Sequence, residues 1–283
     1  MFTGLLLLVV IVSGCSGGGG DSDTASTATS TNTSTSVVTT FAGTGIAGST
    51  DATGVAASFS MPSGITNDGT NLYVTDTSNN IIRKIVIATG AVTTLAGTAN
   101  ALGGTADGTG SAASFLTPSG ITTDGTNLYV TTSYGGSIRK IVIATGVVTT
   151  LSGAAAAGLT FPSGITTDGS NLFVTDFGNF TIRKTVIATG VTTTLAGTAN
   201  TGGTADGTGA AAQFITPMGI ATDNTNLYVT DGNRIRKIVI ATGVVTTLAG
   251  STSSGSVDGT GTAARFDTPM GITIEGNYLY VAD

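Results

Sequence analysis

Apolar residues occur along this chain in short runs that polar residues and glycines separate. Leu72-Tyr73-Val74 and Ile85-Val86-Ile87 are examples of these runs. Short runs rich in β-branched and aromatic residues are typical of strands. Asp68-Gly69 and Ala88-Thr89-Gly90 lie between such runs and indicate tight turns, because glycine adopts a positive φ without strain. The pattern therefore predicts short antiparallel strands joined by hairpins.

One unit of this pattern recurs five times along the chain. Repetition at intervals of roughly 50 residues is the sequence signature of a repeat architecture. In the first unit we predict four strands, near residues 64–66, 72–74, 82–87 and 92–96. Each copy begins with the marker Pro-x-Gly-Ile, at Pro62, Pro118, Pro162, Pro217 and Pro269.

The middle strands of each unit carry apolar side chains on both faces. Leu72 and Val74 share one face of their strand, and Tyr73 lies on the other. A sheet that is apolar on both faces must lie between other sheets. Four-stranded sheets stacked radially are the blades of a β-propeller, so we predict an all-β propeller with four complete blades and a partial fifth. A β-helix is the alternative, although its coils are usually shorter and need no hairpins.

The unit Pro-x-Gly-Ile, Asp-Gly-x-Asn-Leu-Tyr-Val-x-Asp, Ile-Arg-Lys-Ile and Gly-x-Val-x-Thr-Leu-Ala-Gly resembles the NHL repeat over residues 37–283. The resemblance implies a propeller, commonly of six blades. The fifth unit stops at Asp283, after its second strand, and Val37–Ala42 matches a lone fourth strand. We therefore expect a ring cut short from six blades, with a gap or an imperfect seal by Val37–Ala42. An irregular five-bladed ring is the alternative.

A leader precedes the repeats. Leu5–Val12 is a continuous apolar run, shorter than the roughly 20 residues that cross a bilayer and as long as the core of a signal peptide. It runs into Val12-Ser13-Gly14-Cys15, which resembles the lipobox of bacterial lipoproteins. In that family the cysteine receives a diacylglycerol and becomes the mature N-terminus. We expect a lipoprotein signal peptide at 1–14 and lipidation of Cys15, and the alternative is an ordinary secretory peptide.

Residues 15–36 are almost all small or polar, so we expect a lipidated cysteine followed by a disordered Gly/Ser/Thr tether. This lipid anchor would make a membrane of the bacterial cell envelope a partner of the protein. Ser16 stands where an aspartate signals inner-membrane retention in enteric bacteria, and this favours the outer membrane, at its periplasmic face or at the cell surface.

Composition narrows the classes of function. The 283 residues include 10 Lys and Arg, 16 Asp and Glu and no histidine, which gives a formal net charge of −6. Nucleic acid is not an expected partner, because its binding needs a basic surface. Without histidine the chain lacks the usual group for acid–base catalysis and for metal ligation. We therefore expect no catalytic residues, no metal site and no cofactor.

Aspartate recurs at two positions of the unit, and each is a candidate site for an ion or an ion pair. Calcium needs six to eight oxygens, and each Asp-Gly-Thr-Gly loop offers one carboxylate, so we interpret these loops as structural turns. The aspartates after the second strand are interpreted as ion-pair partners of the arginines in the third. The Asp-Gly-Thr-Gly loops begin at Asp107, Asp206 and Asp258. The expected ion pairs are Asp76 with Arg83, Asp176 with Arg183 and Asp231 with Arg236. In the second unit Thr132 takes the place of the aspartate, and Arg139 is kept.

The remaining candidates are aromatic residues in loops. We expect the second-to-third and fourth-to-first loops to share one face and to be long and variable, which favours recognition there. The loop Ala154–Phe161 is much shorter than its counterparts, and the loops beside it carry Tyr134, Phe177 and Phe180, where the first unit has polar residues. Aromatic side chains contribute strongly to interfaces, so we predict a ligand-binding site at these three residues. The alternative is that their rings only cover the gap.

These observations favour a noncatalytic binding or scaffolding propeller, anchored at the envelope, that recognises a protein, peptide or glycan through its long-loop face. One alternative is a metal-dependent hydrolase or lyase, because amidating lyases, streptogramin lyases and lactonases have related propellers. Those enzymes use histidines or convergent carboxylates at the channel, which would have to come from further sequence. The other alternative is an extracytoplasmic sensor, with a signalling domain beyond Asp283.

Overall fold

The computed structural model describes residues 37–99, 102–152 and 158–283. The predicted signal peptide and tether, with Cys15, lie outside the described residues. Within these ranges the chain forms strands joined by turns and by single-turn 3-10 helices. No helix in this part of the chain is long and apolar enough to cross a membrane.

The first unit folds into the four-stranded antiparallel sheet that the sequence predicts. Its strands are β1 (Pro62–Asn67), β2 (Asn71–Asp76), β3 (Ile81–Val86) and β4 (Val92–Ala96), and they pair in chain order. The first turn closes because the backbone N–H of Asp68 donates to the carbonyl oxygen of Asn71 at 3.2 Å, with Gly69 at a φ of 85°. The short helix η2 (Thr77–Asn79) joins β2 to β3.

The other units repeat this sheet, which confirms four complete blades and a two-stranded fifth. The second sheet holds β6 (Pro118–Thr123), β7 (Asn127–Thr132), β8 (Ser137–Val142) and β9 (Val147–Ser152). The third holds β10 (Pro162–Thr167), β11 (Asn171–Asp176), β12 (Thr181–Val186) and β13 (Thr192–Ala196), with η4 (Phe177–Asn179) between its middle strands. The fourth holds β15 (Pro217–Thr222), β16 (Asn226–Asp231), β17 (Arg234–Val239) and β18 (Val244–Gly250), and the fifth β19 (Gly271–Glu275) and β20 (Tyr278–Ala282).

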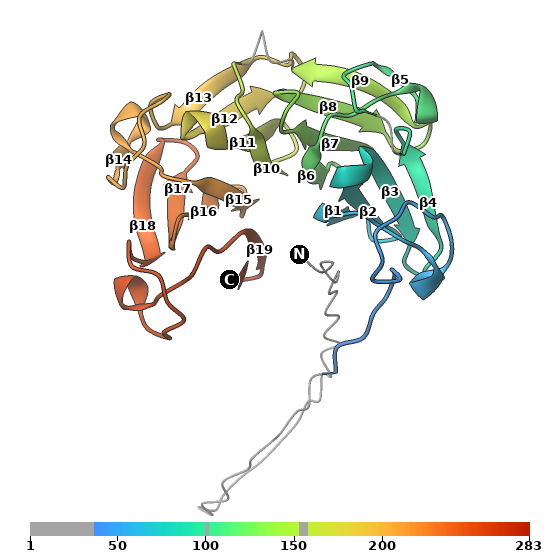
Figure 1. Cartoon of the computed structure of the whole chain (residues 1–283). Coiled ribbons are helices and arrows are strands. Elements are labelled where there is room, and N and C mark those ends of the chain that lie inside the picture. The colour runs from blue at the N-terminus through green and yellow to red at the C-terminus, as the bar shows by residue number, and fades with distance from the viewer. Residues whose placement is uncertain (1–36, 100–101, 153–157) are drawn as a thin grey trace, which may run out of the picture.

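The sheets stand side by side in an arc, with their first strands on the inner side (Figure 1). Apolar side chains fill the spaces between successive sheets, as where Tyr73 and Ile82 of the first sheet meet Phe115 and Val148 of the second. Both faces of the middle strands are therefore buried, as predicted, and this arrangement is that of a β-propeller. The arc is open between β19 and β1 (Figure 1).

Neighbouring inner strands are linked by the threonine near the end of each second strand. The Thr75 hydroxyl accepts from the backbone N–H of Gly64 at 2.7 Å and donates to the carbonyl oxygen of Ser119, in the next sheet, at 2.6 Å. A Cβ on Gly64 would collide with that same carbonyl, so the marker glycine lets the sheets approach. The equivalent donors are Thr131 to Ser163, Thr175 to Met218 and Thr230 to Met270.

The long connections follow the outer rim, and one prediction about loops is wrong. The turns between second and third strands are short, at 77–80, 133–136, 177–180 and 232–233. Only the fourth-to-first connections are long, and they pass outside the next sheet, where β5 (Gly108–Thr109) pairs with β9 and β14 (Gly207–Thr208) with β18. They hold the 3-10 turns η3 (Gly110–Ala112), η5 (Gly209–Ala211) and η6 (Gly261–Ala263), and η1 (Gly54–Ala56) lies in the segment before β1. A single recognition face made of long loops is therefore absent from the described chain.

The predicted lone strand at Val37–Ala42 is also not formed. This segment has no ladder partner among the described strands, and Val37 and Val38 are exposed. Ala42 is nevertheless buried against Val74 and Ile85 of the first sheet. The sequence there has the composition of a strand, but a strand also needs a neighbour that supplies its hydrogen bonds.

Candidate functional site

An arginine occupies the same place in the four complete sheets, completely buried as Arg83, Arg139 and Arg236 and largely buried as Arg183. In the first sheet the Arg83 Nη1 lies 3.0 Å from Oδ2 of Asp76, and Nη2 lies 2.8 Å from Oδ1 of Asp51. Its guanidinium also lies over the Phe59 ring, 4.8 Å from the ring centre. The predicted ion pairs are thus confirmed here, and those between Asp176 and Arg183 and between Asp231 and Arg236 recur at 3.1 and 2.9 Å.

The second sheet keeps the arginine without the strand-end carboxylate. Thr132 stands in that position, and its hydroxyl lies 2.7 Å from that of Ser137. Arg139 pairs instead with Asp107 at 2.8 Å, and Asp107 also accepts from the Thr150 hydroxyl at 2.9 Å. Partial burial acts to raise the pKa of Asp107, but the contacts with Thr150 and Arg139 outweigh it, and the pKa is lowered. The carboxylates of Asp107 and Asp206 therefore organise the rim, which confirms the structural interpretation of these two loops.

Burial has the opposite effect on the strand-end aspartates. It raises the pKa of Asp76 and of Asp176, against hydrogen bonds from Asn79 and Asn179 and the charges of the neighbouring arginines. A side chain that is repeated in several sheets, fully buried and paired with an arginine serves the scaffold. Among the described residues, no group of three or more Asp, Glu, Cys or His side chains is placed to hold a metal ion.

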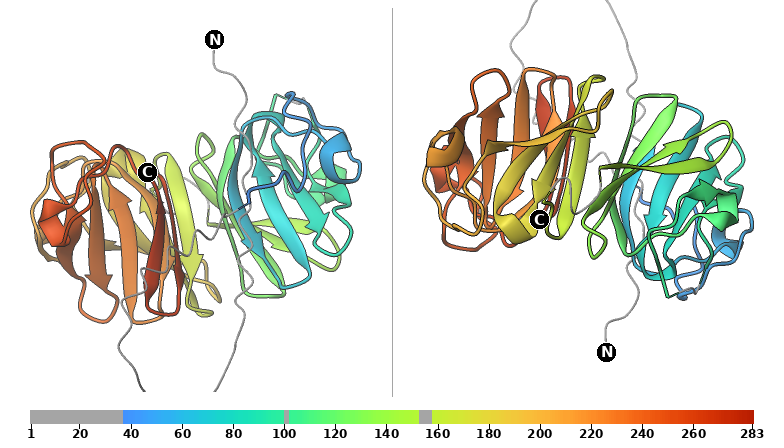
Figure 2. Two further views of the ribbon diagram at one scale, coloured as in Figure 1. Left: turned by 90° about the horizontal axis from the view of Figure 1, so that it is seen from below. Right: turned by 90° about the horizontal axis from the view of Figure 1, so that it is seen from above.

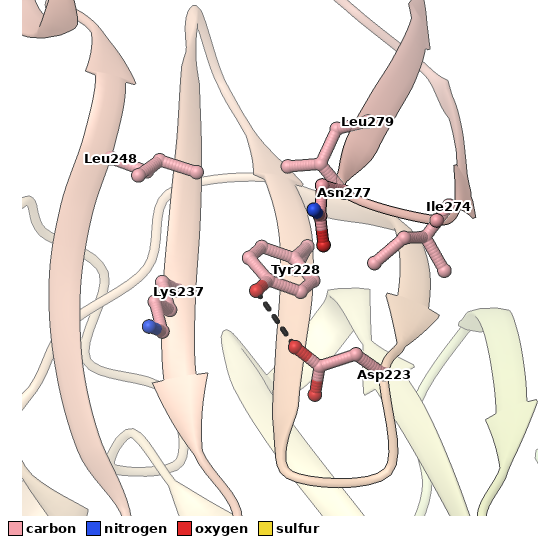
Figure 3. Close-up of a pocket in the computed structure, with 8 residues that line it drawn as sticks. Asp223, Tyr228, Lys237, Leu248, Ile274, Asn277 and Leu279 are labelled. Atoms are coloured by element: carbon pink, nitrogen blue, oxygen red, sulfur yellow. Dashed lines mark hydrogen bonds between the residues drawn. The ribbon is translucent and has the colours of Figure 1, made fainter.

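A cavity of about 290 Å³ lies between the fourth and fifth sheets (Figure 3). The Tyr228 hydroxyl donates to Asp223 inside it at 2.9 Å. The same pair recurs as Tyr73 with Asp68, where the next sheet buries the tyrosine completely. The cavity is therefore the space beside the two-stranded fifth sheet. Its lining is Asp223, Tyr228, Lys237, Leu248, Ile274, Gly276, Asn277 and Leu279.

The most distinctive surface feature is a pair of aromatic rings that joins the second and third sheets. Tyr134 lies in the turn between β7 and β8, and Phe161 directly precedes β10. Their ring centres are 5.3 Å apart and the ring planes meet at 87°, which is the favourable edge-to-face geometry. Tyr134 is 70% exposed and Phe161 is 43% exposed. The two rings thus present an open aromatic corner to solvent.

Hydrogen bonds hold the turn that carries Tyr134 and the segment before Phe161 in place. The N–H of Tyr134 donates to the Thr117 hydroxyl at 3.1 Å, and the N–H of Gly178 donates to the carbonyl oxygen of Thr160 at 2.8 Å. Phe161 has a φ of 51°, and Met61 and Thr117 have a φ of 50° at the same place in their units. The backbone conformation therefore recurs in other units, whereas the aromatic side chain at this place is special to the third unit.

The structure brings together only part of the predicted aromatic site. Phe177 is half-buried. At the equivalent position of the first and second sheets, Thr77 and Ser133 donate hydrogen bonds to the next sheet. Phe180 is also half-buried, and its ring lies beside Gly202, in the connection to the fourth sheet. The Phe180 ring thus lies on the side of the fourth sheet.

Sequence reasoning missed Phe161, although a signal was present. The residue before the marker proline is Met61, Thr117, Thr216 or Thr268 in the other units. An aromatic side chain at this place is a departure from the repeat, as Tyr134 is where the first unit has Ser78. Because repeated residues build the scaffold, two adjacent exposed departures mark the candidate site.

Comparison with solved structures supports the fold. The chain is similar to a structural genomics protein of unknown function from Bacteroides thetaiotaomicron, with 20% identity over 87% of this chain and 72% of that one, at a TM-score of 0.56. It is similar to a chain of a nidogen/laminin complex, with 22% identity over 79% and 72% and a TM-score of 0.57. An auxiliary nutrient binding protein from Bacteroides thetaiotaomicron has 16% identity over 80% and 67%, with a TM-score of 0.53.

No model of a known protein family matches the chain, and no curated protein matches it. At these identities the similar structures bear on the fold alone. Together with the radial four-stranded sheets, they establish that the chain folds as a β-propeller.

Proposed function

We propose that this protein is a noncatalytic binding propeller of NHL-type repeats, tethered to the bacterial cell envelope through a lipid on Cys15. Its ligand is a protein, peptide or glycan that docks on the aromatic corner of Tyr134 and Phe161. The observation that carries the proposal is this exposed edge-to-face pair, at a place where the repeat is broken.

The chemistry of the corner suits weak, shape-selective contacts. Aromatic faces attract the C–H groups of a sugar ring or an apolar peptide side chain, and they lose little conformational entropy on binding. The rings stand on a scaffold whose loops are fixed by backbone hydrogen bonds, so the site is already formed before the ligand arrives. A catalytic hydroxyl needs an adjacent base to activate it, and the residues at this corner, Thr117, Tyr134, Thr160 and Phe161, supply no carboxylate, amine or imidazole.

The anchor and the repeat type rest on the sequence. The lipobox-like Val12-Ser13-Gly14-Cys15 supports lipidation, and the recurring Ile-Arg-Lys-Ile and Asp-Gly-x-Asn motifs support NHL-type repeats. We place the protein at the outer membrane, on its periplasmic face or at the cell surface. A tether of the length of residues 15–36 would let the aromatic corner reach ligands away from the lipid surface.

The proposal is tested with two matched double variants. Tyr134→Ala with Phe161→Ala removes the corner, and Ser78→Ala with Met61→Ala changes the same two repeat positions in the first sheet, where Met61 is 72% exposed. Both variants should melt within a few degrees of the parent, because exposed side chains contribute about 0.5 kcal/mol or less. Binding to arrays of defined oligosaccharides and peptides should be lost in the first variant and kept in the second. Equal binding by both variants would contradict the proposal.

A further inference from the structure

The interface between the second and third sheets differs from its neighbours at three positions. At the other well-packed interfaces an alanine, an isoleucine and a valine meet at equivalent places. These trios are Ala42, Ile85 and Val92, then Ala96, Ile141 and Val148, then Ala196, Ile238 and Val245. Between the second and third sheets the same places hold Ser152, Thr185 and Thr192.

The three hydroxyls form a short chain across this interface. The Ser152 Oγ lies 2.9 Å from Oγ1 of Thr192, which lies 2.7 Å from Oγ1 of Thr185. Ser152 and Thr185 are buried, and Thr192 is partly buried. The hydroxyls satisfy one another, but they replace apolar groups whose burial holds the neighbouring sheets together. Hydrogen bonds between hydroxyls are readily exchanged for hydrogen bonds to water, so opening this interface costs less.

The described part of the apolar core between these two sheets is correspondingly smaller. Ten buried residues form the core between the first and second sheets, and ten form that between the third and fourth. Among the described residues, six form the core between the second and third: Tyr129, Ile138, Leu159, Ile165, Leu172 and Val174. Leu159 stands there in place of Phe115 and Phe214, so a smaller side chain fills the rim of this interface.

Rim hydrogen bonds join the first sheet to the second and the third sheet to the fourth. Gly110 accepts from Gly97 and donates to Gly146, both at 3.0 Å, and so ties the end of β4 to the second sheet. Gly209 does the same between Gly197 and Gly243, at 3.0 and 2.9 Å. The connection after β9 covers only residues 153–161 and contains no aspartate that could act as Asp107 and Asp206 do. Seen from above in Figure 2, the second sheet (green) stands beside the third (yellow).

The inner side of this interface keeps its links. Thr131 donates to the carbonyl oxygen of Ser163 at 2.5 Å, and Ser133 donates to that of Pro162 at 3.0 Å. An interface that is linked along the inner strands and polar toward the rim has the construction of a hinge. We infer that the propeller flexes at this interface, opening at the rim about the inner strands β6 and β10.

The hinge would act on the aromatic corner, because Tyr134 belongs to the second sheet and Phe161 to the third. Opening changes the distance and the angle between the two rings. The inference goes beyond the proposed binding function and holds for the protein without its ligand, so the two can fail separately.

Three equivalent pairs of exposed threonines allow a matched test. Spin labels at Thr93 and Thr149 report on the first and second sheets, labels at Thr149 and Thr193 on the hinge, and labels at Thr193 and Thr246 on the third and fourth sheets. Each threonine of a pair is replaced by a cysteine that carries the spin label, in the full chain with Cys15→Ser so that only the introduced cysteines react. Double electron–electron resonance then measures the distance between the two labels. We expect a broader distribution, with a tail to longer distances, for the hinge pair alone.

A triple variant then tests the cause. Ser152→Ala, Thr185→Ile and Thr192→Val restore the apolar trio and should narrow the hinge distribution to the width of the other two. The reverse set, Ala96→Ser, Ile141→Thr and Val148→Thr, should broaden the distribution of the Thr93–Thr149 pair. Equal widths for all three pairs in the parent protein would overturn the hinge. A broad hinge pair that the restoring variant leaves unchanged would overturn its assignment to the hydroxyl chain.

Discussion

The Nη1 atom of Arg83 lies 3.0 Å from Oδ2 of Asp76, and both side chains are completely buried. The same carboxylate accepts the backbone N–H of Ser60 at 2.7 Å and the side-chain amide of Asn79 at 2.9 Å. One aspartate thus joins the turn after β2, the third strand and the connection that arrives from the rim. Ion pairs of this kind hold the scaffold of the first, third and fourth sheets.

Removing this carboxylate should destabilise the propeller strongly. Asp76→Ala leaves the buried charge of Arg83 without its fully buried partner, and breaking such a pair costs about 3–5 kcal/mol. Asp51→Ala is the control, since that carboxylate is 47% exposed and its loss should cost about 1 kcal/mol or less. Urea unfolding of the three proteins measures both effects. Equal losses in the two variants would show that burial does not set the strength of this pair.

The marker glycine should tolerate no side chain. A Cβ on Gly120 would collide with the carbonyl oxygen of Ser163 in the next sheet. Because that atom belongs to the backbone, Gly120→Ala should cost about 3 kcal/mol or more, as overpacking does. Gly125→Ala places a methyl in open space at a φ of 87° and should cost only about 1–2 kcal/mol. Thermal melts of both variants decide, and an unchanged melt for Gly120→Ala would contradict the close approach of the inner strands.

Stability should fall in acid through the turn aspartates. Although burial acts in the opposite direction, hydrogen bonds from Asn226, Thr225 and Tyr228 lower the pKa of Asp223 to about 2. A carboxyl whose pKa is lower in the folded than in the unfolded protein stabilises the fold above pH of about 4, and this contribution is lost between about pH 4 and pH 2. Asp223→Asn should therefore be less stable than the parent at neutral pH, and the difference should vanish toward pH 2. A difference independent of pH would contradict this assignment.

The strands were predictable because their signals are local. Asp68-Gly69 fixes a hairpin, and the alternation around Tyr73 reports burial on both faces. The path of the long connections was not predictable, because the pairing of Gly108 with Val148 joins residues far apart in the sequence. In Val37–Ala42 the local pattern was misleading: its composition is that of a strand, but no strand forms because no neighbouring strand pairs with it.

The candidate site was predicted in part for a similar reason. Tyr134 was singled out as a departure from the repeat, and it is exposed as a binding residue must be. Phe180 was chosen by the same logic, but its left-handed backbone, with a φ of 56°, accompanies a ring that lies beside Gly202 instead. The contact between Tyr134 and Phe161 depends on how two sheets approach each other, which no local pattern encodes.

Processing of the leader tests the anchor. Cys15→Ala, or treatment with globomycin, which blocks the signal peptidase of lipoproteins, should leave the unprocessed precursor in the membrane fraction. Mass spectrometry of the parent protein should find a diacylglycerol on Cys15 as the first residue. Normal cleavage under both treatments would indicate an ordinary secretory peptide and would remove the membrane anchor from the account.

Photo-crosslinking in the living cell shows whether the aromatic corner contacts a ligand in the envelope. The photoreactive amino acid p-benzoylphenylalanine replaces Tyr134 in one strain and Ser78, at the same repeat position of the first sheet, in another. Irradiation followed by mass spectrometry should find a discrete covalent adduct from position 134 and none from position 78. No adduct at position 134, or the same adducts from both positions, would contradict the account.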